Sequence, residues 1–167
     1  LIKEIENEYS SIRSIGIGIP GSVSSETSLI KNANSIWLNG KPFRSDLEKI
    51  LKKEIRLEND ANCFALSEAV DGAGKNHQVV FGVIIGTGMG AGIVINRNIH
   101  RGKNLVAGEF GHTSLPRSHD SEIKLAEQCY CGLKGCNETF LSGPGFTSIF
   151  NNTYNTNFET KEIIKLH

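Results

Sequence analysis

Three cysteines cluster in the stretch CYCGLKGC, residues 129–136, and His112 lies upstream with sixteen residues between it and the first of them. Three thiolates and one imidazole form a closed tetrahedral ligand set for Zn²⁺. Since protein would fill all four positions, the ion would be structural, fixing a loop that has little core of its own. The alternative is three reduced surface cysteines without a metal. We predict a zinc site formed by His112, Cys129, Cys131 and Cys136.

The composition gives no sign of a strongly charged partner. The 167 residues include 18 basic and 18 acidic side chains, so the formal net charge is zero, which offers no reason to expect nucleic acid or an anionic membrane as a partner. No apolar run approaches the ~20 residues that span a bilayer. The charged residues 1–8 do not read as a secretory signal, and clustered cysteines suit a metal loop better than a disulfide framework. We expect a soluble, cytoplasmic protein.

Patterns in the first half of the chain predict strands alternating with helices. Residues 14–21 alternate isoleucine with small residues and end in Pro-Gly, which is typical of a strand followed by a turn. Residues 45–53 carry acid early and base late, as a helix dipole favours. A strand over residues 55–58 then leads into a helix over residues 63–70.

The second half is rich in glycine. Fourteen of the 18 glycines lie between positions 72 and 145, where the backbone must turn tightly or approach another group closely. A buried strand over residues 79–85, the glycine run 86–92 and a strand over residues 93–96 predict a hairpin. Residues 113–136 are expected to be irregular, and a further helix is expected over residues 146–150.

A polar, glycine-rich break at residues 71–76 is the best candidate for a domain boundary. We therefore expect domains over residues 1–74 and 75–167. Helical patterns at residues 1–12 and 160–167 begin or stop abruptly, so we expect the chain to be the middle of a longer protein. The alternative is a complete small domain with frayed ends.

The glycine run, Gly-Thr-Gly-Met-Gly-Ala-Gly, does not fit a dinucleotide-binding fingerprint, because Ala91 stands where the third glycine belongs and a strand follows. It is not a Walker loop either, because it lacks Gly-Lys-Ser/Thr. Glycines in a hairpin can aim successive N–H groups at phosphate oxygens, and they can equally serve a tight turn alone. The residues by themselves leave these two readings open.

Acidic residues recur near the predicted strand end and the metal loop. Asp60 follows a strand, where ligands of open α/β sheets usually lie, although by itself it reads more readily as an N-cap of the helix over residues 63–70. The zinc site would also bring Glu109 and Glu138 together. Three carboxylates with the amide of Asn59 would suit a polyol, whereas without the metal the two glutamates read as solvated loop charges.

Four motifs occur in an order that resembles the ROK family (repressor, open reading frame, kinase) of sugar kinases. Residues 57–69 are most similar to the bacterial N-acetylglucosamine kinases of that family, and the resemblance covers about residues 12–147. The motifs are Glu58-Asn59-Asp60-Ala61-Asn62, Gly86-Thr87-Gly88-x-Gly90-x-Gly92, Gly108-Glu109-Phe110-Gly111-His112 and Cys129-x-Cys131-Gly132-x-x-Gly135-Cys136-x-Glu138.

The resemblance implies an α/β, actin-like (ribonuclease-H-like), two-lobed sugar kinase fold, incomplete at both ends, with residues 1–74 in the N-terminal lobe and residues 75–167, including the zinc loop 112–136, in the C-terminal lobe. It implies phosphoryl transfer from Mg²⁺-ATP to the 6-hydroxyl of N-acetyl-D-glucosamine. Asp60 would be the catalytic base. The residues that would hold the sugar are Asn59, Glu109, His112, Glu138, Gly21 and Asn34, and those that would cradle ATP phosphates are Gly86, Thr87, Gly88, Gly90 and Gly92.

Two departures leave alternatives open. The family's Asp-x-Gly-Gly-Thr phosphate loop and its C-terminal glycine motif are missing from this chain, so the chain alone is expected to be inactive. A sugar-sensing repressor, another hexose kinase (for glucose, fructose or N-acetylmannosamine) and a zinc-stabilised binding module are the alternatives. Family analogy favours a homodimer.

Overall fold

The computed structural model describes residues 2–8, 14–116 and 119–166. The chain divides into two compact units, Leu1–Cys63 and Phe64–His167. This division falls within the helix over residues 60–70, whereas a boundary was expected at residues 74 and 75, in the turn that follows this helix. The assignment of the two parts to two kinase lobes stays a prediction.

The first unit is built on a parallel strand pair. Strand β1 (Ser14–Ile19) pairs with β4 (Glu54–Asn59), and Ile19 lies opposite Asn59. Because the strands are parallel, their carboxyl ends share one edge, where binding residues of α/β sheets gather. The remaining elements are α1 (Ile2–Glu8), β2 (Ser22–Val23), β3 (Ile30–Lys31), η1 (Ile36–Leu38) and α2 (Phe43–Leu51).

The core of this unit consists of Ile19, Ile30 and Ala33, with Leu57 and Phe43 packed against them. The core therefore joins the ends of β1 and β3 and leaves the polar residues that follow β1 and β4 at its margin. The strands expected over residues 14–21 and 55–58 are confirmed.

The two helices expected in this unit are found with shifted bounds. The helix expected over residues 45–53 is confirmed as α2, which begins two residues earlier, directly after Pro42. Of the helix expected over residues 1–12, residues 2–8 are helical, and residues 9–12 lie outside the described residues.

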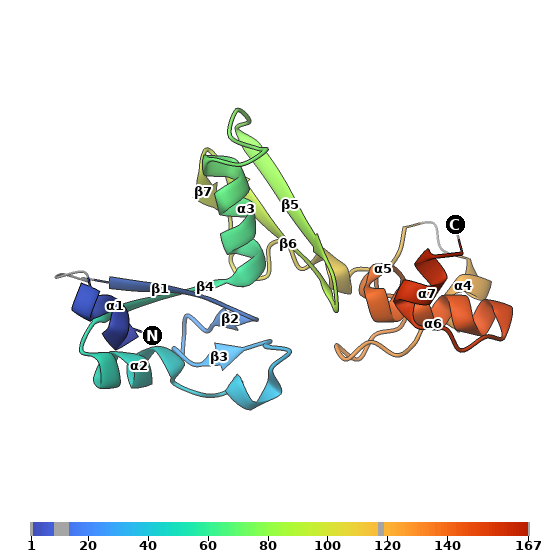
Figure 1. The fold of residues 1–167 in the computed structure, drawn as a ribbon, viewed down its shortest axis with the longest axis horizontal. Helices are drawn as coiled ribbons and strands as arrows, with labels where there is room; N and C mark the ends of the chain where they lie inside the picture. Colours follow the sequence, from blue (N-terminus) through green and yellow to red (C-terminus); the bar gives the residue numbers. More distant parts are fainter. Residues whose placement is uncertain (1, 9–13, 117–118, 167) are drawn as a thin grey trace. The chain divides into compact units, whose positions relative to one another are not determined.

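The second unit contains an antiparallel sheet in the order β5 (Val79–Ile85), β6 (Met89–Ile95), β7 (Asn98–Ile99). Helix α3 (Asp60–Val70) lies along this sheet (Figure 1), and its Ala65 and Ala69 are buried with Val94 of β6. The expected hairpin is confirmed, but its turn is shorter than predicted. Strand β6 begins at Met89, so much of the glycine run forms strand instead of turn.

Glycine permits close packing of a strand as well as a tight turn, and a sequence does not distinguish the two. In this hairpin, close packing accounts for glycines that lie in a strand. Gly92 lies opposite Gly82 of β5. A Cβ on Gly82 would lie only 2.9 Å from the Cβ of Ala65 in α3. Small residues thus let this helix and sheet approach closely.

Short helices follow the sheet, namely η2 (Phe110–His112), α4 (Asp120–Leu125), α5 (Glu138–Leu141), α6 (Gly143–Tyr154) and α7 (Thr160–Ile164). Residues 113–136 were expected to be irregular, but residues 120–125 of this range form the helix α4. The helix expected over residues 146–150 is longer because Ser142 caps it, its Oγ accepting the Gly145 N–H at 3.1 Å, and Pro144 suits its first turn.

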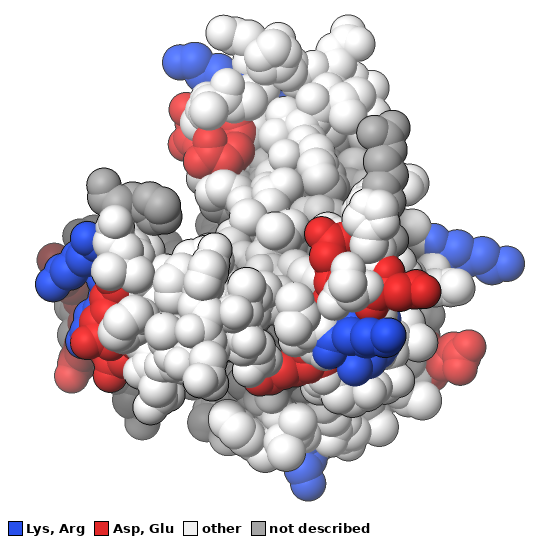
Figure 2. Space-filling model, turned by 90° about the vertical axis from the view of Figure 1, so that its right-hand side faces the viewer, with Lys and Arg blue, Asp and Glu red and all other residues white. Residues whose placement is uncertain are grey.

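The surface carries charges of both signs. On the face drawn in Figure 2, acidic and basic side chains form small groups separated by uncharged surface. Within the described ranges, none of the helices has the length and apolarity that a membrane crossing requires.

The close contact at Gly82 yields a stability prediction. Gly82→Ala should lower the free energy of unfolding by ~1–3 kcal/mol, because the new methyl group overlaps Ala65 and pushes α3 from the sheet. Urea unfolding followed by circular dichroism measures this. Gly16→Ala, where a Cβ meets nothing within 4 Å, is the matched control and should be near neutral. Equal stability of the two variants would contradict the packing described.

Candidate functional site

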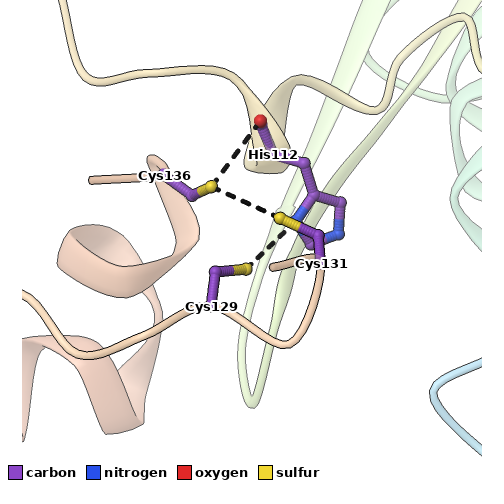
Figure 3. A group of neighbouring side chains, drawn as sticks. All are labelled: His112, Cys129, Cys131 and Cys136. Atoms are coloured by element: carbon purple, nitrogen blue, oxygen red, sulfur yellow. Dashed lines mark hydrogen bonds between the residues drawn. The ribbon is translucent and has the colours of Figure 1, made fainter. Parts of the chain in front are cut away.

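The four predicted metal ligands converge in the second unit. Figure 3 shows the three thiols and the imidazole of His112 turned toward one another, and their ligand atoms all lie within 4.8 Å of each other. Cys131 Sγ and Cys136 Sγ are 3.6 Å apart, and Cys129 Sγ is 3.4 Å from His112 Nδ1. Ligands of a tetrahedral zinc ion with Zn–S bonds of about 2.3 Å lie about 3.8 Å from one another. The cluster therefore fits a metal ion such as zinc.

Backbone pairing holds this cluster together. Ser114 and Cys136 form an antiparallel bridge, and Leu115 N donates to Gly135 O at 3.1 Å. Gly132 and Gly135 have φ values of +90° and +80°, conformations that favour glycine and turn the loop back on itself. The thiol-bearing loop is thereby aligned with the residues just after His112.

Asn137 is a further organising residue that sequence reasoning missed. Its buried side chain donates from Nδ2 to Phe110 O at 2.9 Å and to Thr113 Oγ1 at 3.1 Å. It thus ties the residue after the last cysteine to the turn that carries His112. The feature of the sequence that could have pointed to Asn137 is its position between two predicted site residues, Cys136 and Glu138.

The protonation state of the clustered thiols would change when a cation binds. Burial, together with the neighbouring thiols of Cys131 and Cys129, raises the pKa of Cys136 to about 12. Burial also raises the pKa of Cys129. Burial acts in the same direction on Cys131, but hydrogen bonds from the Leu133 backbone and from the other two thiols outweigh it and lower the pKa of Cys131. Because a metal binds thiolates, binding at Cys129 and Cys136 must release protons.

The motif that carries Glu109 and His112 lies directly on β6. A Cβ on Gly111 would overlap the carbonyl oxygen of Met89, and one on Gly108 would overlap that of Ala91. Phe110 packs edge-on against Phe81 of β5, with ring centroids 5.3 Å apart. The two glycines therefore allow the backbone approach that sets Glu109 and His112 beside the strand.

Glu138 is fixed against the same strand. Its Oε2 accepts the Met89 N–H at 2.8 Å, and it lies close enough to Gly88 that a Cβ there would be 2.9 Å away. This contact joins α5 to the start of β6. Glu138 is thus an oriented carboxylate rather than a solvated one.

Tyr130 connects the metal cluster to the glutamates. Its hydroxyl lies 2.8 Å from His112 Nε2, and the two rings meet edge to face with centroids 4.9 Å apart. Burial of the hydroxyl, together with the carboxylates of Glu138 and Glu109, raises the pKa of Tyr130 to about 12. Glu109 directly precedes η2, which carries His112, and Glu138 begins α5 two residues after Cys136, so the segments that carry the metal ligands also carry two carboxylates, acceptors that suit a polyol.

The remaining predicted sugar residues lie in the first unit. Asn59, not Asp60, caps α3, because Asn59 Oδ1 accepts the Asn62 N–H at 3.1 Å. Asn59 Nδ2 donates to Gly21 O at 3.1 Å, and Asp60 Oδ1 accepts the Ala61 N–H at 2.9 Å. The helix begins at Asp60, three residues before the predicted start. The reading of Asp60 as an N-cap is thereby replaced.

Gly21 and Asn34 belong to neighbouring turns of that unit. Gly21 has a φ of +79°, and a Cβ there would lie 2.7 Å from Ala33 N. Asn34 is exposed and follows Ala33 directly. Asn39, which sequence reasoning missed, fixes this turn by bonding both the N–H and the C=O of Ala33, at 2.9 Å and 3.0 Å.

The glycines expected to hold phosphate take up different positions. Gly86 and Thr87 line a pocket of about 910 Å³ that also includes the start of α6 and polar side chains of Thr147 and Asn151. Gly88 lies beside Glu138, whereas Gly90 and Gly92 lie within β6. The tip of the hairpin is therefore the part that faces an open pocket.

Comparison with known proteins identifies the protein family. The family model described as ROK family matches residues 1–167. The chain belongs to the ROK family. Its fold is accordingly the actin-like α/β fold of ROK sugar kinases. A solved ROK hexokinase from Thermus thermophilus is 28% identical, with a TM-score of 0.79 over 98% of this chain and 52% of that one.

Two further ROK proteins bear on function. An N-acetyl-D-glucosamine kinase of Shigella boydii is 40% identical over 100% of this chain and 56% of its own length. A solved ROK transcriptional regulator, a homologue of the Escherichia coli MLC protein, is 25% identical, with a TM-score of 0.71 over 92% of this chain and 38% of that one. The chain spans about half the length of the curated relatives that it matches.

The thiol cluster predicts one bound metal ion per molecule. Cys131→Ser, at an exposed ligand position, should lower the metal content well below one equivalent and lower the midpoint of thermal unfolding, since three donors hold the ion less tightly. Elemental analysis of protein prepared under reducing conditions measures this. Cys63→Ser alters an exposed cysteine outside the cluster and should keep the metal. Unmodified protein without metal would contradict the assignment.

Proposed function

We propose that the protein is an ATP-dependent sugar kinase that phosphorylates the 6-hydroxyl of N-acetyl-D-glucosamine. The observation that carries this proposal is the convergence of His112 with the three thiols, on the segments that also carry Glu109 and Glu138. The relative that is 40% identical bears the name of that activity. Carboxylates and an imidazole fixed in direction are suited to several sugar hydroxyls at once.

We assign the cluster to Zn²⁺, held by His112, Cys129, Cys131 and Cys136. Zinc with four protein ligands supplies structural stability instead of an open catalytic position. Its role would be to fix the ring of His112 and the loop that leads to Glu138. Metal and sugar binding would therefore be coupled through the shape of this loop.

The residues of the first unit would supply the proton chemistry. Asp60 would accept the proton of the attacking hydroxyl as its oxygen bonds to the γ-phosphorus, while the bond from that phosphorus to the oxygen bridging the β- and γ-phosphates breaks and ADP leaves. The Ala61 N–H bonded to Asp60 Oδ1 orients this carboxylate. Asn59 Oδ1 accepts a hydrogen bond in the helix cap, and one N–H of its Nδ2 donates to Gly21 O, so the other N–H would hold the sugar. Gly21 and Asn34 would line the same side of the sugar.

The nucleotide would lie against the tip of the glycine hairpin. Gly86 and Thr87 line the pocket of about 910 Å³, and the N–H and hydroxyl of Thr87 would meet phosphate oxygens. The Gly86 N–H donates to Gly88 O at 2.9 Å, so Gly86 would shape the turn instead of donating to phosphate. Bound Mg²⁺ would neutralise phosphate charge. Gly90 and Gly92 would support the hairpin from within β6. The cytoplasmic location and the homodimer stay predictions from the sequence.

A sugar-sensing repressor is the second candidate, favoured by the similarity to a ROK transcriptional regulator. The residues that precede position 1 in the natural protein distinguish the two. An Asp-x-Gly-Gly-Thr loop there indicates a kinase, and a helix-turn-helix indicates a repressor.

The proposed base predicts a specific kinetic defect. Asp60→Asn in the full-length protein should lower kcat about 10²–10⁴-fold, because the amide cannot take up the proton, while the sugar Kd stays close to its original value. A coupled ADP-release assay and calorimetry measure the two quantities. Asp71→Asn, in the turn after α3, is the control and should retain full turnover. Unchanged turnover in Asp60→Asn would refute the role.

The sugar itself can be identified by ligand-dependent stabilisation. A ligand that binds the folded state raises its unfolding temperature by mass action. N-acetylglucosamine should raise the thermal midpoint of the full-length protein more than glucose, fructose or N-acetylmannosamine at equal concentration. A larger shift with another of the four sugars would reassign the substrate, and no shift with any would contradict the kinase.

A further inference from the structure

Two hydroxyl groups, one on Tyr130 and one on the proposed sugar, would compete for the same nitrogen of His112, Nε2. Nδ1 faces Cys129 Sγ at 3.4 Å, on the side of the thiols. When Nδ1 binds a metal, the neutral ring carries its proton on Nε2, and this N–H points at the Tyr130 hydroxyl, 2.8 Å away. A single N–H makes one linear hydrogen bond. The proposed function assigns that same N–H to a sugar hydroxyl.

The Tyr130 hydroxyl has the surroundings that a sugar hydroxyl would need. With His112 Nδ1 on a metal, this hydroxyl would accept the Nε2–H of His112, 2.8 Å away, as a sugar hydroxyl would. The segments that carry the metal ligands also carry two carboxylates, Glu109 and Glu138, that suit hydroxyl donors. Neither the zinc ligand spacing nor the carboxylate pattern requires a phenol between Cys129 and Cys131. The Tyr130 hydroxyl thus makes the contact with His112 that a bound sugar hydroxyl would make.

Little holds the ring in this place. Tyr130 is 69% exposed, and its described side-chain contacts are the hydrogen bond and the edge-to-face contact with His112. The neighbouring Gly132, at a φ of +90°, marks a turn where the loop carries no side chain. The ring can therefore swing into solvent at the cost of these contacts.

We propose that Tyr130 determines sugar affinity by occupying the proposed sugar-binding position at His112 Nε2, its hydroxyl standing in for a sugar hydroxyl that displaces it. The inference rests on the proposed function. Sugar must displace the phenol before it reaches His112, so the contact lowers the apparent affinity. A neutral hydrogen bond of ordinary net strength corresponds to about a 2- to 10-fold change in an equilibrium constant.

The test is Tyr130→Phe in the full-length protein, which keeps the ring and removes the competing hydroxyl. The Kd for N-acetylglucosamine from calorimetry and the KM should each fall about 2- to 10-fold, with kcat and metal content unchanged. Tyr154→Phe makes the same chemical change on α6, where the ring packs on Phe150, and should leave Kd and KM unaltered.

The outcomes are distinguishable. A Kd for Tyr130→Phe that is unchanged or higher than that of the unmodified protein, with metal retained, overturns the inference and leaves the kinase proposal standing. An unmodified protein that binds none of N-acetylglucosamine, glucose, fructose and N-acetylmannosamine overturns both. Loss of metal in Tyr130→Phe would show that the hydroxyl serves the metal site, which also contradicts the proposed role.

Discussion

The convergence of His112 with three cysteine thiols is the constraint on which the second unit depends. The ligand atoms lie within 4.8 Å of one another, although they come from a short turn and from a loop many residues later. Burial raises the pKa of Cys136 and Cys129, so a cation that binds their thiolates must displace their protons. The loop between α4 and α5 contributes few buried apolar side chains, so a bound ion would supply much of what keeps it folded.

Glycine acts here through close approach as well as through turning. Gly108 and Gly111 let the turn before and within η2 meet carbonyl groups of β6, and Gly82 lets α3 meet β5. Each contact removes freedom from a residue that matters for the proposed chemistry. Glu109 and His112 are directed by the first two, and Glu138 is directed by the Met89 N–H of the same strand.

Residue chemistry made the metal ligands predictable from the sequence. Few structures other than a metal site use three cysteines and a histidine at such spacing, so His112 and the thiols could be grouped without coordinates. Both strands of the first unit were predicted, the first from its alternating isoleucines, but their parallel pairing was not. The family resemblance then supplied the actin-like fold, which periodicity alone did not specify.

The contacts that could not be predicted are those for which one residue pattern fits two different local structures equally well. A glycine run fits a turn and a tightly packed strand equally well, so the start of β6 at Met89 was missed. Asn59 and Asp60 are both good helix caps, and the hydrogen bond to Asn62 N selects Asn59. The pairing of Tyr130 with His112 depends on how the metal loop folds back, which no local pattern encodes.

The central claim is that one metal-organised loop presents His112, Glu109 and Glu138 to a sugar. A crystal structure of the full-length protein with N-acetylglucosamine, recorded at the zinc absorption edge, tests this most directly. We predict an anomalous peak enclosed by Cys129, Cys131, Cys136 and His112 Nδ1, with sugar hydroxyls donating to both glutamates. A sugar bound elsewhere, or glutamates turned away from it beside an ordered metal, would contradict the account.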